Sequence, residues 1–255
     1  MGRRLDEREL RRRAVKSVRD QVEAFGSAHS DSVLIRRPGL LAAVVPSSPQ
    51  RSFFNSVFYS DPATLSAEVG ALGEAYESAG VDAWTVWVPD EDRDSARMLE
   101  ARGHMLDASP RAMAMEFADL GPELAAPEGV EAGPADSSTC AALNDRAYGF
   151  GPDGFAAGIA GETSIQWRAA FAGGEPVGCV GTIAIGDDCL ITGVATPPEH
   201  RGRGIASWLV RSALTGAREQ GMTTASLQAS RAGASIYECL GFRDLGFLEM
   251  WELRR

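Results

Sequence analysis

A short stretch in the C-terminal half of the chain combines residue types that bind an anion. An apolar run ending at Val194 precedes Pro197-Pro198, and the chain then passes through Arg201-Gly202-Arg203-Gly204 into the periodic segment Ile205 to Glu219. This pattern predicts a strand, a turn and a helix. Because glycine carries no side chain, the amides before and within the first helical turn can point at one ligand, which the positive helix end and two arginines also attract. The stretch therefore predicts a diphosphate site.

Other interpretations compete for this glycine-rich turn. A P-loop carries a Lys-Ser/Thr pair after its glycines, where this chain has Ile205-Ala206, so nucleotide hydrolysis is not favoured. A dinucleotide-binding fingerprint needs a third glycine, which is missing. The remaining alternative is an ordinary strand-to-helix turn with two solvated arginines, and an R-G-R-G taken alone favours that alternative.

Two motifs that follow each other along the chain favour the diphosphate site over an ordinary turn. Arg201-x-x-Gly204-x-Ala206 resembles the pyrophosphate-binding (Q/R)-x-x-G-x-(G/A) motif of the GNAT N-acetyltransferase superfamily. The segment Ile236 to Phe242 resembles the L-Y-x-x-x-G-F segment of the same family. The resemblance is good from about Val177 to Phe242 and weaker over Val130 to Arg255. It implies an α/β fold of the α+β type, built on a mixed sheet.

The resemblance also implies a donor and a set of site residues. The donor is acetyl-CoA, whose pantetheine arm pairs with the backbone of residues 194–196 and whose diphosphate is held by residues 202–207. The residues implied to bind the cofactor are Val194, Ala195, Thr196, Arg201, Gly202, Arg203, Gly204, Ile205, Ala206, Ser207 and Ser230. Tyr237 is implied to be the general acid that protonates the departing thiolate. The alternative for Tyr237 is a helix tyrosine that only packs on the sheet.

The general base is not evident. Relatives that use a glutamate place it on the fourth or the fifth strand, which here fall near Leu190 and Ala225, and neither is a carboxylate. Asp187, Asp188 and Tyr148 are candidate substitutes, although the aspartates are equally well explained as turn residues. A chain of water molecules, or an amine that arrives neutral, would serve without them.

The segment Tyr148 to Phe155 is too rich in glycine for a regular element and too aromatic for a plain solvent loop. In the GNAT family this region lies beside the acceptor pocket, so Tyr148, Phe150 and Asp188 are the expected substrate residues. The alternative is a loop that packs against the core.

An internal repeat indicates two copies of one fold. The segment Asp61 to Phe117 shows the same order of helices, strands and glycines as the segment from Gly204 to the closing strand. The first copy has Tyr59-Ser60-Asp61-Pro62 at the position of R-G-R-G, and Leu99 at the position of Tyr237. We therefore expect two GNAT-like domains in tandem: a degenerate one over 1–120 without a CoA site, a linker over 121–133, and an acetyltransferase domain over 134–255.

The amino-acid composition disfavours several classes of binding partner. The formal charge of −10 and the pI near 4.9 disfavour a nucleic-acid or anionic-membrane surface, and the Arg11-Arg12-Arg13 run is better explained as a solvated helix face. The four cysteines show no C-x-x-C pairing and the three histidines are scattered, so no metal site is expected. No apolar run approaches the roughly 18 residues of a membrane span, and no hydrophobic signal core is present, so we expect a cytoplasmic protein, monomeric or homodimeric.

The sequence thus favours an N-acetyltransferase whose acceptor is a small-molecule amine or a peptide amine. The identity of that acceptor is not encoded in any recognisable motif. A non-catalytic acyl-CoA-binding sensor or scaffold is the main alternative, which the missing base permits and Tyr237 opposes. An RGG-like nucleic-acid module is a further alternative that the net charge disfavours.

Overall fold

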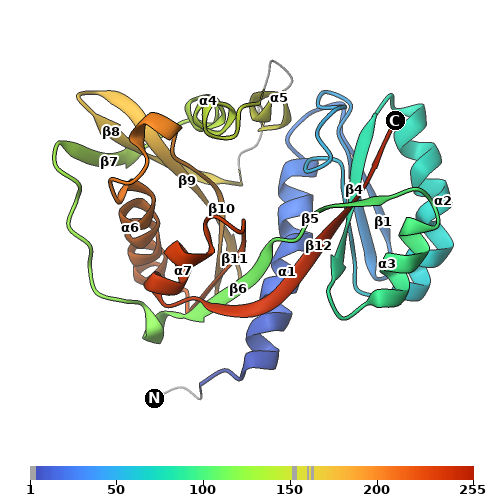
Figure 1. The fold of residues 1–255 in the computed structure, drawn as a ribbon, viewed down its shortest axis with the longest axis horizontal. Helices are drawn as coiled ribbons and strands as arrows, with labels where there is room; N and C mark the ends of the chain where they lie inside the picture. The colour runs from blue at the N-terminus through green and yellow to red at the C-terminus, as the bar shows by residue number, and fades with distance from the viewer. Residues whose placement is uncertain (1–3, 151–153, 160, 162–163) are drawn as a thin grey trace. The chain divides into compact units, whose positions relative to one another are not determined.

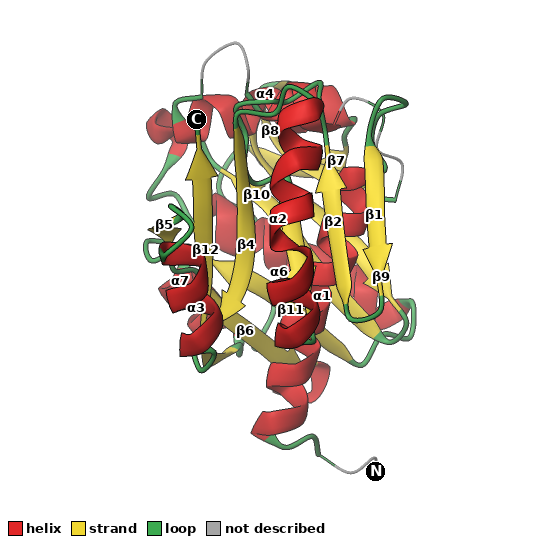
Figure 2. Ribbon diagram, turned by 90° about the vertical axis from the view of Figure 1, so that its right-hand side faces the viewer, coloured by secondary structure: helices red, strands yellow, loops and turns green. Residues whose placement is uncertain are grey.

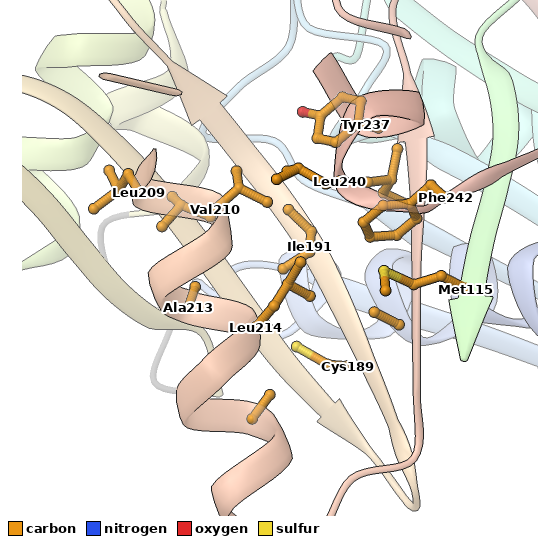
Figure 3. Packing of buried hydrophobic residues seen from close by; sticks show 14 of the residues in the cluster. Met115, Cys189, Ile191, Leu209, Val210, Ala213, Leu214, Tyr237, Leu240 and Phe242 are labelled. Carbon is orange, nitrogen blue, oxygen red and sulfur yellow. The ribbon is translucent and has the colours of Figure 1, made fainter. Parts of the chain in front are cut away.

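The predicted strand, turn and helix appear in the computed structural model as β10 (Asp188–Ala195) and α6 (Ile205–Glu219). Apolar residues recur every three or four positions along α6, so one face of the helix is buried. That face is formed by Ile205, Leu209, Val210, Ala213, Leu214 and Ala217. Figure 3 shows it packed against Cys189 and Ile191 of β10 and against Leu240 and Phe242. The core of this part of the chain therefore lies between α6 and the sheet.

The described residues are 4–150, 154–159, 161 and 164–255, and they divide into two compact units (Figure 1). Unit 1 draws on Met1–Ser17, Arg111–Ala156 and Thr163–Leu245. Unit 2 draws on Val18–Pro110, Ala157–Glu162 and Gly246–Arg255. Three elements supply residues to both units: α1 (Glu7–Gly26), α5 (Phe155–Ile159) and β12 (Arg243–Arg254).

Unit 1 contains a mixed sheet. Its strand order is β6 (Arg111–Glu116), β11 (Thr224–Ala229), β10, β9 (Glu175–Ile185), β8 (Gln166–Ala172) and β7 (Val130–Pro134). The pair β10 and β11 is parallel, and the other neighbours in this order are antiparallel. The predicted strands 166–172, 177–185 and 190–196 are thus present with shifts of two residues or fewer at their ends.

The helices of unit 1 cover both faces of this sheet. α4 (Ser137–Tyr148) begins where the Asp136 carboxylate accepts a hydrogen bond of 2.7 Å from the Thr139 amide. On β9, a Cβ at position 178 would touch Ile205 of α6, whereas Cys179 contacts Asn144 of α4. Since successive residues of a strand point to opposite faces, α4 and α6 lie on opposite faces of the sheet. α7 (Ala234–Leu240) packs beside α6.

Unit 2 repeats the central part of this arrangement. Its strands are β1 (Val33–Arg37), β2 (Leu40–Val44), β3 (Ser56–Tyr59), β4 (Ala83–Pro89), the second part of β12, and β5 (Met105–Ala108), which pairs with β12. β3 and β4 are parallel, as are β10 and β11 in unit 1. α2 (Pro62–Ser78) and α3 (Arg93–Glu100) lie over one face of these strands (Figure 2). The order of elements predicted from the repeat is therefore observed in both units.

The units do not follow the predicted ranges 1–120 and 134–255. β6 follows α3 and β5 along the chain but pairs with β11 in unit 1, over Thr224↔Glu116 to Ala229↔Arg111. The second part of β12 follows α7 along the chain but pairs with β4 in unit 2. The sheet of each unit thus includes a strand that comes from the other half of the sequence. Local periodicity predicts that these strands exist, but their partners are set by long-range pairing.

Two short 3₁₀ helices complete the described elements, η1 (Phe117–Asp119) and η2 (Pro198–His200). None of the helices in the described part of the chain has the length and apolar character that crossing a membrane requires.

Candidate functional site

The turn before α6 presents a row of unsatisfied backbone amides. Gly202 and Gly204 both have φ of +75°, a left-handed conformation that glycine adopts without strain. α6 has no side-chain cap, and the first amide with an acceptor is that of Trp208, which donates to the Gly204 carbonyl at 3.0 Å. Among the described residues, the amides of 202–207 have no hydrogen-bond acceptor.

The space in front of these amides is open. A Cβ placed on Gly202 or on Gly204 would meet no atom within 4 Å. The amide row, the positive end of a 15-residue helix and the absence of side chains together fit a diphosphate. We call residues 202–207 the amide cradle.

Arg201 makes two hydrogen bonds to backbone carbonyls of the chain. Its Nε donates to the Thr196 carbonyl at 3.0 Å and its Nη2 to the Ala147 carbonyl at 2.6 Å. The guanidinium thus joins the last turn of α4 to the segment that follows β10, and so positions both beside the cradle. Arg201 and Arg203 are both exposed next to the cradle. A contact between Arg201 and the diphosphate stays a prediction.

The end of β10 next to the cradle has a free backbone edge. The parallel register with β11 covers only Asp188, Cys189 and Leu190, so the two strands are no longer paired where β10 reaches Val194. The register with β9 shifts between Thr192 and Ala195, which marks a bulge at Gly193, whose φ is +57°. The edge of β10 that faces β11 is therefore unpaired near Val194, although the Val194 and Thr196 carbonyls accept hydrogen bonds from Tyr148 and Arg201. Pairing of this edge with a pantetheine arm stays a prediction.

Buried polar residues hold this bulge in place. Asn144 of α4 donates through Nδ2 to the Gly193 carbonyl at 3.2 Å and to the Cys140 carbonyl at 2.9 Å. The Cys179 thiol also donates to the Gly193 carbonyl, at 3.4 Å. The sequence analysis missed Asn144 and Cys179, because neither belongs to a motif and only the fold brings them to the bulge.

Tyr148 and Phe150 lie at the same end of β10. The Tyr148 hydroxyl donates to the Val194 carbonyl at 3.1 Å, and its ring stacks on Phe150 with 5.7 Å between ring centroids. The Tyr148 side chain is 53% exposed, so its ring is available to a ligand. The rest of the predicted aromatic loop, residues 151–153, lies outside the described residues.

Tyr237 approaches the site from α7. Its side chain is only 9% exposed, and its ring meets Phe242 edge to face at 5.8 Å and 75°. Its hydroxyl points away from the apolar cluster (Figure 3) and has no hydrogen-bond partner among the described residues. Burial, and secondarily the neighbouring Tyr148, raise the pKa of Tyr237 well above the ordinary value. Tyr237 therefore carries its proton at neutral pH.

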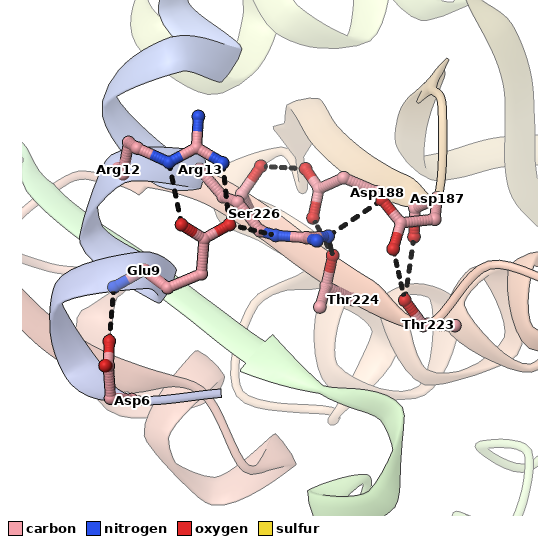
Figure 4. Close-up of polar contacts among 9 residues, drawn as sticks. All are labelled: Asp6, Glu9, Arg12, Arg13, Asp187, Asp188, Thr223, Thr224 and Ser226. Carbon is pink, nitrogen blue, oxygen red and sulfur yellow. Dashed lines mark hydrogen bonds and ion pairs between the residues drawn. The ribbon is translucent and has the colours of Figure 1, made fainter. Parts of the chain in front are cut away.

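Asp188 lies away from this site. It is the first residue of β10, and six residues of strand, about 20 Å at about 3.3 Å per residue, separate it from Val194. Its carboxylate accepts hydrogen bonds of 2.6 Å from Thr224 and from Ser226 (Figure 4), and burial raises its pKa. Asp188 thus belongs to a buried polar cluster at the start of β10. It does not lie beside Tyr148 and Phe150.

The two remaining candidates from the sequence, Asp187 and Ser230, have hydrogen-bond partners within the chain. Asp187 pairs with Arg13 at 2.8 Å and accepts a hydrogen bond from Thr223 at 2.7 Å (Figure 4). Ser230 accepts a hydrogen bond of 3.2 Å from the Gly233 amide in the turn before α7, and its side chain is exposed there. Leu190 and Ala225, the two positions at which the sequence resemblance would place a glutamate, are completely buried.

The first copy lacks the open amide row. Asp61 caps α2, accepting hydrogen bonds from the Ala63 amide at 3.1 Å and from the Thr64 hydroxyl at 2.8 Å. These hydrogen bonds, with that of the Thr64 side chain first, lower the pKa of Asp61, so a negative charge occupies the helix end where an anion would bind. Leu99, at the position of Tyr237, is part of the apolar core of unit 2.

Comparisons with known proteins agree with this geometry. Residues 164–244 match the family model described as the acetyltransferase (GNAT) domain. The chain is 36% identical over 88 residues to N-acetyltransferase 8B of Homo sapiens, a match that covers 29% of this chain and 38% of that protein. The chain thus spans well under half of the length of this curated relative.

Solved structures resemble almost the whole chain. A GCN5-related N-acetyltransferase from Kribbella flavida superposes with a TM-score of 0.69 at 19% identity, over 94% of this chain and 95% of that one. A tandem GNAT protein from the clavulanic acid biosynthesis pathway superposes with a TM-score of 0.61 at 14% identity, over 91% and 87%. The fold is therefore that of GCN5-related N-acetyltransferases, and residues 164–244 match the GNAT acetyltransferase domain in sequence.

Proposed function

We propose that this chain is an N-acetyltransferase that transfers an acetyl group directly from acetyl-CoA to an amine, with the reaction in unit 1. The observation that carries the proposal is the open amide cradle at residues 202–207 beside the free edge of β10. Neither feature stabilises the fold, because backbone amides without an acceptor and an unpaired strand edge are unfavourable for a folded protein.

Each part of the donor has a matching part of the chain. The diphosphate fits the cradle, where main-chain amides and the helix end supply positive potential. The pantetheine arm, which carries amide groups, fits the unpaired edge at Val194, Ala195 and Thr196. Acetyl-CoA supplies an acyl thioester, whose carbonyl carbon is open to attack by an amine. Binding at both places would fix this carbon near Tyr148 and Tyr237.

Two proton transfers accompany the reaction. A C–N bond forms and the C–S bond breaks; the amine loses one proton and the departing thiolate gains one. Tyr237 is the proposed donor to the sulfur. Because burial raises its pKa, a phenolate would be costly there, so the Tyr237 hydroxyl acts chiefly by donating a hydrogen bond to the developing thiolate, and solvent completes the proton transfer.

No carboxylate stands at the positions of Leu190 and Ala225 to accept the amine's proton. We therefore infer that the amine reacts from its neutral form, or loses its proton to water. The rate should then rise with pH towards the pKa of the acceptor.

The acceptor is proposed to be an amine on a small molecule or a peptide. The exposed Tyr148 ring, with the half-buried Phe150 ring stacked on it, offers the acceptor an apolar and cation-binding surface. The formal charge of −10 favours association with a cationic acceptor and disfavours nucleic acid. All four cysteines are free, which is consistent with the reducing cytoplasm.

The missing base also supports a second candidate function, an acyl-CoA-binding sensor or scaffold without turnover. A screen of amine acceptors with acetyl-CoA, followed by release of free thiol, separates the two. Acceptor-dependent thiol release that a Gly204→Val variant loses supports the enzyme. Tight acetyl-CoA binding without release for any amine in the screen supports the sensor.

A further inference from the structure

Unit 1 contains a cavity that has no part in the proposed reaction. It is a cavity of about 600 Å³ along α6, and it extends from Trp208 to the C-terminal end of that helix. Its floor includes Arg168 of β8 and Thr182 of β9, and Leu124 lies at its rim. Neither the amide cradle nor Tyr237 lines it. Its size is that of pockets that hold small organic ligands.

A buried arginine faces this cavity without a counter-charge. Arg211 of α6 is 5% exposed. Its Nε donates to the Gly121 and Pro122 carbonyls at 3.0 and 3.1 Å, and its Nη1 donates to the Thr215 hydroxyl. All these acceptors are neutral. Within the described residues no carboxylate lies within 4.0 Å of the guanidinium.

A second arginine shares the cavity. Arg168 precedes Ala170 by two positions on β8, and Ala170 packs in the core beneath α6, so Arg168 points to the same face. Its Nε is buried and has no hydrogen-bond partner in the described structure, which also contains no ion pair of Arg168. A buried donor without an acceptor is unfavourable, and a ligand acceptor would remove that cost.

The remaining lining indicates what else the ligand carries. Trp208 and Leu124 offer apolar surface, and Leu124 is unusually exposed for a leucine. Glu123 and Glu219 also line the cavity, but both are exposed, so solvent screens their charges. The cavity therefore combines two uncompensated guanidinium groups inside with an apolar rim.

We propose that this cavity binds a small molecule with an oxyanion, a carboxylate or a phosphate, on an apolar body, held by Arg168 and Arg211. Arginine suits either group because its planar fork of donors matches two oxygens at once. The site is separate from acetyl transfer, so its test does not depend on the proposed function.

Calorimetry on the full chain without acetyl-CoA tests the proposal, with benzoate as the carboxylate probe, benzamide as its neutral counterpart and inorganic phosphate as the second oxyanion. We expect benzoate or phosphate to bind with one site per chain, and benzamide to bind at least about ten-fold more weakly than benzoate, the equivalent of one charge-assisted hydrogen bond. Preference for benzoate identifies a carboxylate ligand, and preference for phosphate a phosphate ligand.

Arg168→Gln should weaken the preferred oxyanion about ten-fold or more. The matched control is Arg218→Gln, which removes an exposed arginine of α6 outside the cavity. Arg168 is chosen because Arg211 also holds the 121–122 backbone. The proposal is wrong if neither oxyanion binds, if benzamide binds as well as the preferred oxyanion, or if a folded Arg168→Gln protein binds like the wild type.

Discussion

Replacing Gly204 with valine is expected to weaken CoA binding about 100-fold while the protein stays folded. A Cβ at this position points into space that is open in the structure, where the diphosphate is proposed to lie. Losing about two charge-assisted hydrogen bonds, at roughly 1.5 kcal/mol each, amounts to about 3 kcal/mol, or two orders of magnitude in Kd.

The same substitution also strains the backbone. With φ at +75°, a β-branched residue costs about 1–2 kcal/mol. This is a minor part of the roughly 5–15 kcal/mol that stabilises a typical domain, and it should lower Tm by only a few degrees. The variant is therefore expected to fold, so its affinity can be measured by isothermal titration calorimetry with CoA.

Gly221→Val is the matched control. Gly221 follows the other end of α6 with φ of +88°, and a Cβ there also meets no atom within 4 Å. The control should lose a similar amount of stability and keep its affinity for CoA. Wild-type affinity in a folded Gly204→Val protein would refute the diphosphate assignment. Equal losses of affinity in both variants would show that strain, and not contact with the ligand, is responsible.

Three further predictions concern other parts of the chain. Tyr237→Phe removes one hydrogen-bond donor to the developing thiolate, so kcat should fall about 10²–10³-fold with little change in CoA affinity. An unchanged kcat would leave Tyr237 only its packing on Phe242. Because Asp61 fills the helix end of the first copy, a calorimetric titration should reach one CoA per chain, and a stoichiometry of two would contradict this. Burial lowers the pKa of His104 to about 4 from 6.5, so the unfolded chain takes up the proton first as pH falls. Stability should be full above about pH 6.5 and drop by about 3 kcal/mol towards pH 4. Denaturant unfolding of His104→Phe at several pH values should show a flatter profile than that of the wild type.

Local sequence patterns predict most of the elements. The segment from Ile205 to Glu219 is a helix over the expected residues, Asp61 and Pro62 start α2, and Asp136 caps α4. These features depend on residues within one or two turns of each other, through apolar spacing, caps and positive-φ glycines. The same short-range rules predict the amide cradle, because it needs only a strand, two glycines and a helix start.

Local sequence patterns do not predict the features that join distant segments of the chain. Arg201 satisfies two carbonyls 5 and 54 residues away, and this use cannot be distinguished from anion binding in the sequence. Asp188 appears in the sequence as a turn residue, yet pairing with β11 buries it against Thr224 and Ser226. Arg168 and Arg211 lie on different elements, and only the fold places both in the lining of one cavity. Leu124 of the predicted linker lines the same cavity.

The sequence by itself determined the repeated order of elements, the glycine-rich turn before the helix of the second copy and the aspartate cap at the same position in the first. Only the tertiary structure decided that β6 pairs with β11 in unit 1 and that the second part of β12 pairs with β4 in unit 2. The physical reason is that a strand's alternation specifies which face is buried, whereas its backbone hydrogen bonds are the same for every partner. The choice of partner depends on the packing of the whole chain, and with it the final set of side chains around each site.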